Sequence, residues 1–282
     1  MVALFFNNMK IVGKNSFTNN SFIKLKDQSW IDKQRLAGKI VAHTLKLLQN
    51  QVETGSHLSL SQLNELGELN ILNQGGTPTF KGYKGFPAGV CISVNRQLVH
   101  GIPTDTQLKN GDVISFDLGV TYEGAIADSA LTCIYGTPAS PRHVDLINST
   151  NESLLRGIKA IGIGKRLGCI GKAIYKYGRD QGFSVVTKYG GHGLDWNLPH
   201  DAPFVSNKSE TNEGIRIVPG LAIAIEPMLV IGPNDTTVAS DGWTVMTGDI
   251  GAHSEHSVFV HEDRVEIMTW RDDCSYPREL YF

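Results

Sequence analysis

Two aspartates in one short run of the chain could do chemistry together. Asp117 and Asp128 lie in the run 114–135, ISFDLGVTYEGAIADSALTCIY, which reads as two strands joined by a turn. If the loop spans 121–124, the two aspartates lie directly opposite each other. Opposed like charges are destabilising unless a proton or a cation lies between them. The hairpin alone therefore allows a shared proton, a bound metal, or a shifted register with both carboxylates in solvent.

Three further candidates lie in or beside β-rich segments elsewhere in the chain. They are His192 in GGHGL, Glu226 in AIAIEPM and Glu255 in HSEHSVFV. A lone carboxylate after LAIAI is costly to bury unless it is paired or bound to a cation. Four carboxylates and an imidazole suit two divalent metal ions about 3.5–4 Å apart, which would also explain the opposed aspartates. These ligands accept cobalt, manganese, iron or zinc. His253 shares the face of Glu255 and could reach such a site, whereas His256 points to the opposite face.

The elements that must position these residues follow a repeated plan. We expect a helix over 29–52 with Ser29 as its N-cap, and a second helix over 60–73 that is closed by glycines. Helices are predicted again over 143–164 and 167–182, a strand over 183–193, and strands within 221–270. Two units of helix, helix and strand indicate an internal duplication. The predicted fold class is α+β, with an antiparallel sheet covered by helices on one side. We expect an N-terminal arm over 1–25 and a single catalytic domain over 26–282.

Composition narrows the class of protein. The 282 residues are 41% hydrophobic and 19% charged, with a formal net charge of −2, which favours neither nucleic acid nor a membrane surface as a partner. Four cysteines without CxxC spacing fit reduced thiols in a cytoplasmic protein. The start MVALFFNN is too short and lacks the basic flank of a signal or a membrane span. Met9 is an alternative start.

Eight segments occur in the order and approximate spacing found in one family of enzymes. They are YKGFPAGVCISVN, VHGIP, DLGV, IADSA, GGHGL, AIEPM, DGWTV and SEHSVFV. In these segments the chain resembles type I methionine aminopeptidases in their short bacterial form. The resemblance runs from about Trp30 to Trp270, and no single motif carries it. It implies the pita-bread fold, in which two pseudo-symmetric halves with a curved sheet surround a dinuclear metal centre.

The resemblance also implies roles at matched positions. Asp128 and Glu255 would bridge two divalent metals, and Asp117 would chelate one of them. The implied metal ligands are Asp117, Asp128, His192, Glu226 and Glu255, the implied catalytic residues are His100, His200 and Glu226, and the implied pocket residues are Phe80, Tyr83, Phe86, Cys91 and Trp243.

The implied activity is removal of the N-terminal methionine from nascent proteins with a small penultimate residue. In this mechanism a hydroxide that bridges the metals attacks the first peptide carbonyl. The implied partners are N-terminal peptides emerging near the ribosome, with no nucleic acid or membrane, and the chain would be a monomer.

The chain departs from the family pattern at one point, and three alternative functions remain open. Family members have six residues between the histidines matched to His192 and His200, whereas GLDWNLP makes seven here. His200 could therefore be displaced, with Leu198, Pro199 or Trp196 as the pocket wall. The rivals are an Xaa-Pro peptidase of the same fold, a non-catalytic binding protein on that fold, and a mononuclear iron oxygenase.

Overall fold

The computed structural model describes residues 10–12 and 22–282. Most of the predicted N-terminal arm lies outside the described residues. Its described parts, β1 (Lys10–Val12) and β2 (Phe22–Lys24), pair antiparallel. No helix in the described part of the chain combines the length and apolar character that crossing a membrane requires.

Four α-helices lie close to their predicted positions, two in each half of the domain. They are α1 (Gln28–Glu53), α2 (Leu60–Asn73), α3 (Pro141–Ala160) and α4 (Gly168–Asp180), with one 3-10 turn, η1 (Tyr83–Gly85). The prediction of Ser29 as the N-cap of α1 is wrong. Asp27 caps the helix instead, because its carboxylate accepts a hydrogen bond of 3.0 Å from the backbone N–H of Trp30, whose side chain is fully buried.

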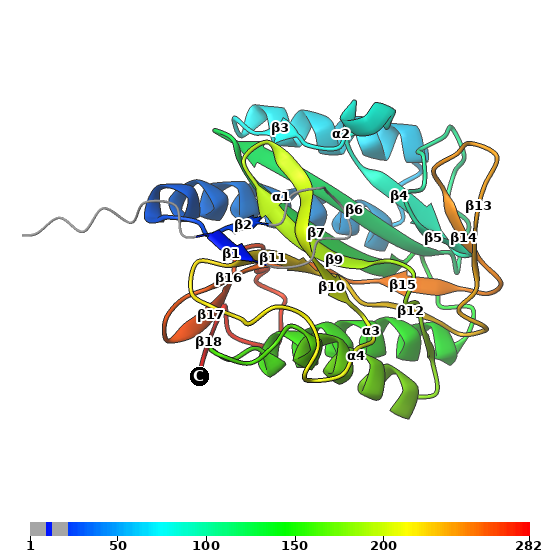
Figure 1. Cartoon of the computed structure of the whole chain (residues 1–282). Helices are drawn as coiled ribbons and strands as arrows, with labels where there is room; N and C mark the ends of the chain where they lie inside the picture. The colour runs from blue at the N-terminus through cyan, green and yellow to red at the C-terminus, as the bar shows by residue number, and fades with distance from the viewer. Residues whose placement is uncertain (1–9, 13–21) are drawn as a thin grey trace, which may run out of the picture.

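The strands of the first half form an antiparallel sheet against which α1 packs (Figure 1). This sheet has the order β3, β6, β4, and β7 adds to β6. Its strands are β3 (Thr77–Pro78), β4 (Cys91–Val94), β6 (Val113–Tyr122) and β7 (Ala125–Ile134).

The second half is built around a larger antiparallel sheet of order β10, β9, β11, β16, β17, β18. Its strands are β9 (Gly190–Asp195), β10 (Leu198–Ser206), β11 (Ala222–Ile225), β16 (His256–Val260), β17 (Arg264–Ile267) and β18 (Glu279–Tyr281). Two small antiparallel sheets complete the fold: β15 (Gly251–His253), β12 (Met228–Val230), β8 (Ser184–Val185), and β13 (Thr236–Val238), β14 (Val245–Thr247), β5 (Gln97–Val99).

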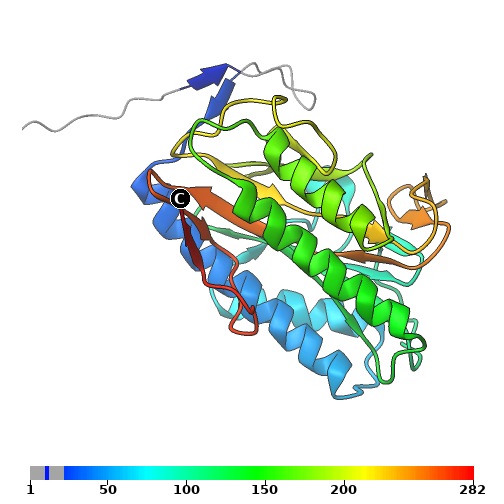
Figure 2. The same cartoon turned by 90° about the horizontal axis from the view of Figure 1, so that it is seen from below.

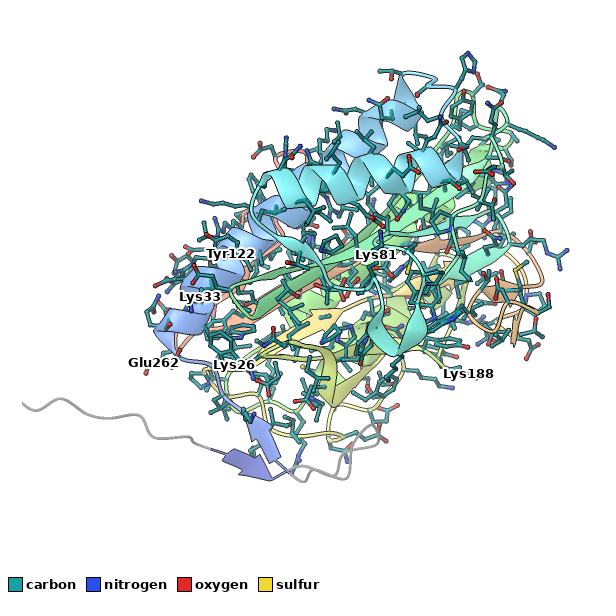
Figure 3. All side chains as sticks on the ribbon, turned by 90° about the horizontal axis from the view of Figure 1, so that it is seen from above. Lys26, Lys33, Lys81, Tyr122, Lys188 and Glu262 are labelled. Carbon is teal, nitrogen blue, oxygen red and sulfur yellow. The ribbon has the colours of Figure 1, made fainter. Side chains whose placement is uncertain are left out.

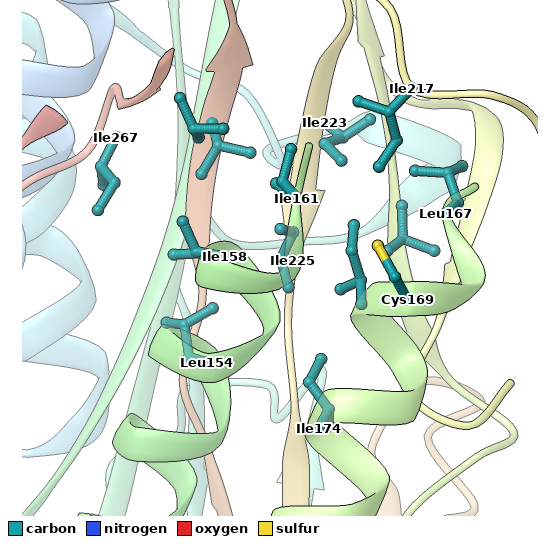
Figure 4. Close-up of a cluster of buried hydrophobic side chains, with 14 of the residues drawn as sticks. Leu154, Ile158, Ile161, Leu167, Cys169, Ile174, Ile217, Ile223, Ile225 and Ile267 are labelled. Atoms are coloured by element: carbon teal, nitrogen blue, oxygen red, sulfur yellow. The ribbon is translucent and has the colours of Figure 1, made fainter. Parts of the chain in front are cut away.

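The helices cover the outside of the strand layer. In Figure 1, α2 lies along the top of the picture, α1 crosses its middle at the height of β6, and α3 and α4 lie at the bottom; Figure 2 shows α3 and α4 side by side. Under α3 and α4, Leu154, Ile158 and Ile174 pack against Ile223 and Ile225 of β11 (Figure 4). A separate apolar cluster lies under α1 and α2, so each half has its own core and the inner face of the strands is left for the site.

The β6–β7 hairpin differs from its prediction in the length of its loop. The turn consists of two residues, Glu123 and Gly124, both with positive φ (45° and 86°), as a type I′ turn requires. The prediction assumed a four-residue loop, and its register was therefore wrong by two positions. In the structure, Asp117 lies opposite Ala130, and Asp128 lies opposite Gly119. Because side chains alternate with a period of two, both aspartates still project from the same face.

Candidate metal centre and active site

Four carboxylates converge on one imidazole at the inner face of the strands. The Nε2 atom of His192 on β9 lies 3.6 Å from Oε1 of Glu226, which directly follows β11. The same atom lies 3.9 Å from Oδ2 of Asp128 and 3.9 Å from Oε1 of Glu255. Ligand atoms of Asp117, Asp128 and Glu255 lie within 4.8 Å of one another. The predicted metal ligands are therefore brought together from both halves of the chain.

The burial and mutual repulsion of these carboxylates favour a bound cation. Asp128 and Glu255 are almost fully buried, and Asp117 is 9% exposed. Among the described residues, no hydrogen-bond partner reaches Oδ1 of Asp117, Oδ1 of Asp128 or Oε1 of Glu255. Burial raises the pKa of Asp128 to about 7, and burial followed by repulsion from neighbouring carboxylates raises the pKa values of Asp117, Glu226 and Glu255. Buried carboxylate oxygens without donors fit a divalent cation.

His192 is prepared as a metal ligand by its surroundings. Its Nδ1 lies 3.1 Å from the carbonyl oxygen of Gly193, which assigns the proton to Nδ1. The unprotonated Nε2 therefore has a lone pair that can bind a metal ion. Burial lowers its pKa to about 4, so the ring is neutral. A Cβ at Gly193 would lie 1.8 Å from the carbonyl oxygen of Ala202, and one at Gly191 would lie 2.1 Å from that of Ala224. The glycines of GGHGL therefore let β10 and β11 approach closely on both sides of His192.

Hydroxyl side chains join the two halves beside the cluster. Ser257 Oγ accepts a hydrogen bond of 2.8 Å from the backbone N–H of Asp128 and donates one of 2.8 Å to its carbonyl oxygen. Ser129 Oγ donates to the carbonyl oxygen of Glu255. Thr132 exchanges similar bonds with the backbone of His253. These bonds fix the separation between Asp128 of β7 and Glu255, which directly precedes β16. They do so although β7 and β16 belong to different sheets.

An apolar cavity of about 350 Å³ opens above the cluster, and it is lined by all of the metal ligands, catalytic residues and pocket residues that the resemblance implied. The ring of Phe86 meets that of Trp243 edge to face, with centroids 5.2 Å apart. Cys91 lies opposite Asp117 in the β4–β6 ladder, and burial, followed by the charge of Asp117, raises its pKa, so the thiol is a neutral wall. The predicted pocket residues in this wall are Phe80, Tyr83, Phe86, Cys91 and Trp243.

His200 reaches the site despite the longer spacing. Leu198 pairs with Asp195 and Asp201 with Gly193, so the strand register shifts by one residue between these pairs. The extra residue is thus absorbed in a β-bulge that contains His200. The His200 ring lies 4.4 Å from that of His192 and 5.4 Å from that of Tyr83.

The expectation that the residues before His200 form the pocket wall is wrong. Trp196 is 40% exposed and packs edge to face on Trp30, at 6.4 Å, because the bulge leaves it at the hairpin tip. Neither it nor Leu198 nor Pro199 is among the residues that line the cavity, where Tyr189 and Phe204 take that place.

Both predicted catalytic histidines are neutral. Burial lowers the pKa of His100, and burial, followed by the repulsion that a protonated His192 would exert, lowers the pKa of His200 to about 2. Such rings can donate or accept hydrogen bonds without carrying charge. His253 also reaches the cluster, with its Nε2 3.4 Å from Oε2 of Glu226. His256 instead bonds Thr269 and Tyr276, each at 2.9 Å, on the other side of its strand.

Several lining residues had no role assigned from the sequence. Tyr189 and Gly190 directly precede the GHG run, and adjacency to His192 was the available signal. Lys84 follows Tyr83 in the same way. Val99 directly precedes His100. For the rest, the sequence carries no signal, because chain pairing alone brings them to the cavity: Lys188, Phe204 and Met228.

The comparisons with known proteins agree with this geometry. Residues 32–262 match the model of metallopeptidase family M24. Methionine aminopeptidase of Mycoplasma capricolum is 39% identical over 88% of this chain and 98% of its own. Methionine aminopeptidase 1 of Bacillus subtilis is 40% identical over 83% and 94%. The crystal structure of methionine aminopeptidase from Rickettsia prowazekii superposes with a TM-score of 0.84, at 34% identity, over 88% of this chain and 100% of that one. The pita-bread fold and the use of divalent metal follow from this kinship, and the chain belongs to metallopeptidase family M24, among its methionine aminopeptidases.

Proposed function

We propose that this protein removes the N-terminal methionine from nascent proteins whose second residue is small. The observation that carries the proposal is a cluster of three buried carboxylates, the partly buried Glu226 and His192 at the floor of an apolar cavity. A thioether side chain suits a wall of aromatic rings and a neutral thiol.

The residues of the cluster would hold two divalent metal ions. Asp128 and Glu255 would bridge them, Asp117 would chelate one, and His192 and Glu226 would complete the set. The unpartnered oxygens and the free Nε2 of His192 support this assignment. Bound metals would supply a water of lowered pKa and polarise the scissile carbonyl. The proposed metal is cobalt, manganese, iron or zinc.

The chain's own residues would orient the substrate and move protons. Glu226 takes the proton of the attacking water and passes it to the leaving amine, because its second carboxylate oxygen remains available. His100 and His200 hydrogen-bond the scissile amide and the developing oxyanion. The aromatic wall around Phe86 and Trp243 holds the methionine side chain and excludes water.

The proposal extends to the domain organisation, the oligomeric state and the location of the protein. Residues 26–282 act as one catalytic domain and residues 1–25 as an arm. The protein acts as a monomer in the cytoplasm, close to the ribosome, on emerging N-termini. Its four cysteines are all free thiols, which supports a reducing compartment.

The direct test is release of methionine from Met-Ala-Ser by protein loaded with manganese or cobalt. We expect release from Met-Ala-Ser, little from a Met-Lys peptide, and none from either by an Asp128→Ala variant. Absence of release from any Met peptide by protein that binds two metals would contradict the proposal.

A further inference from the structure

The charges that line the cavity are arranged in two levels. The four carboxylates lie at the floor, and two bound divalent cations would balance their formal charge. Among the described residues that line the cavity, the ammonium groups are those of Lys84 and Lys188. Both side chains are exposed, whereas the floor residues are buried or nearly so. The mouth of the loaded site is therefore positive.

Each lysine lies beside an aromatic residue of the cavity wall. Nζ of Lys84 lies 5.2 Å from the centroid of the Tyr83 ring, and Nζ of Lys188 lies 5.7 Å from that of Tyr189. Over the described ranges, 10–12 and 22–282, neither lysine forms an ion pair. Their ammonium groups are thus held at the wall by ring contacts but remain available to an acceptor. Lys188 is labelled in Figure 3, well separated in that view from Lys26 and Lys33.

The two lysines come from opposite halves of the molecule. Lys84 lies in the turn η1 beside Tyr83, whose ring centroid is 5.4 Å from that of His200. Lys188 enters from the other half of the molecule, two residues before β9.

The path of a bound polypeptide leads past these lysines. On the proposed function, the first residue lies on the metal ligands and its side chain fills the apolar part of the cavity. The rest of the protein must leave through the mouth, and an extended chain advances about 3.3–3.6 Å per residue. Residues three to five of the substrate therefore pass the rim, within reach of long lysine side chains.

We propose that Lys84 and Lys188 form a cationic rim that selects substrates with Asp or Glu at positions three to five. This inference rests on the proposed function, because it assumes that a peptide N-terminus occupies the floor. Each exposed charge pair contributes little, so the expected preference of kcat/KM for acidic over basic peptides is roughly three- to tenfold at low salt. It should shrink as ionic strength rises, because exposed charges are screened.

The test uses full-length protein loaded with manganese and three peptides that share Met-Ala at their start. Positions three to five are Asp-Asp-Glu, Lys-Lys-Arg or Ser-Ser-Gln. The readout is the ratio of kcat/KM for the acidic and basic peptides within each variant, which cancels any general loss of activity. The variants are K84Q/K188Q and K84E/K188E. The matched control is K208Q, because Nζ of the exposed Lys208 also lies over a tyrosine ring, 4.8 Å from Tyr175, away from the cavity.

We expect an acidic preference in the wild type and in K208Q, its loss in K84Q/K188Q and a preference for basic peptides in K84E/K188E. If the wild type cleaves the Ser-Ser-Gln peptide and has equal kcat/KM for the acidic and basic peptides, the proposal of a selective cationic rim is overturned. The proposed function is then left intact. An acidic preference that persists in K84Q/K188Q would also overturn the rim. Failure to cleave all three peptides would overturn both the proposed function and the rim.

Discussion

Asp117 lies opposite Ala130 and Asp128 lies opposite Gly119, so the two carboxylates approach each other across a diagonal of the β6–β7 hairpin. A diagonal pair on one face has its Cβ atoms further apart than a direct pair, which leaves space between the carboxylates for a cation. With Glu255, their oxygens still lie within 4.8 Å of one another. The hairpin supplies one wall of the metal site, and the second half of the chain supplies the other.

The Asp128→Asn variant should bind less metal than the wild type. The amide lacks the negative charge and one anionic oxygen that a bridging position needs. Metal content per chain, measured by elemental analysis after dialysis, should fall, and the rise in Tm on manganese loading should shrink. Asp180→Asn, at an exposed site at the end of α4, is the control and should keep both values. Unchanged metal content in Asp128→Asn would refute the assignment.

The His200→Gln variant separates two roles that the geometry allows. If His200 donates a hydrogen bond to the developing oxyanion, kcat should fall by about 10²–10³ while metal content stays constant. His200 also lies in a group with Asp128 and His192 that could hold an ion. Loss of metal in parallel with activity would show that His200 is a ligand rather than a hydrogen-bond donor.

A buried ion pair links the residues before α1 to the β9–β10 hairpin, which carries His192 and His200. Nζ of Lys26 lies 2.7 Å from Oδ1 of Asp195, with side chains 4% and 8% exposed. Burial lowers the pKa of Lys26. Lys26→Met leaves the exposed Lys24, at 3.2 Å, as the remaining cation beside the carboxylate, and should lower the free energy of unfolding by about 2–4 kcal/mol.

Urea unfolding of a double-mutant cycle checks this coupling. Lys26→Met/Asp195→Leu should be less destabilised than the sum of the single variants, by at least about 1 kcal/mol. Lys172→Met, which breaks an exposed pair with Glu210, is the control and should change stability by no more than about 0.5 kcal/mol. Strict additivity would mean that Lys26 and Asp195 do not act as a pair.

The stability of the protein should depend on pH through Glu266. Burial raises the pKa of this carboxyl, but hydrogen bonds from Arg35 and His261 outweigh burial and bring the pKa to about 2. A depressed carboxyl pKa contributes stability above the unfolded pKa of about 4.5, and this is lost as pH falls through about 2. The span corresponds to about 3 kcal/mol.

Glu266→Gln should therefore be destabilised by about 2–3 kcal/mol at pH 6, and by progressively less as the pH falls from 4.5 toward 2. The measurement is the free energy of unfolding in urea across that range. Glu262→Gln, at an exposed position in the turn that precedes β17, is the matched control (Figure 3). A difference that does not vary with pH would assign the loss to packing rather than to charge.

Much of the fold could be predicted because its signals are local. The apolar spacing of α1 and α2 predicted both helices almost to the residue, and the order of elements predicted two halves. The N-cap was wrong because Ser29 and Asp27 are both good caps, and the burial of Trp30 decides between them. The hairpin register was wrong by two because a two-residue turn and a four-residue loop are both compatible with the same alternating pattern.

The sequence by itself determined the residue types of the site and their parity on the strands. Asp117 and Asp128 share a face at either register. Only the tertiary structure decided whether His200 enters the cavity, because a β-bulge is a property of two paired strands rather than of one. It likewise decided that Lys84 and Lys188 share the mouth of one cavity, since residues so distant in sequence meet only when both halves of the chain have packed.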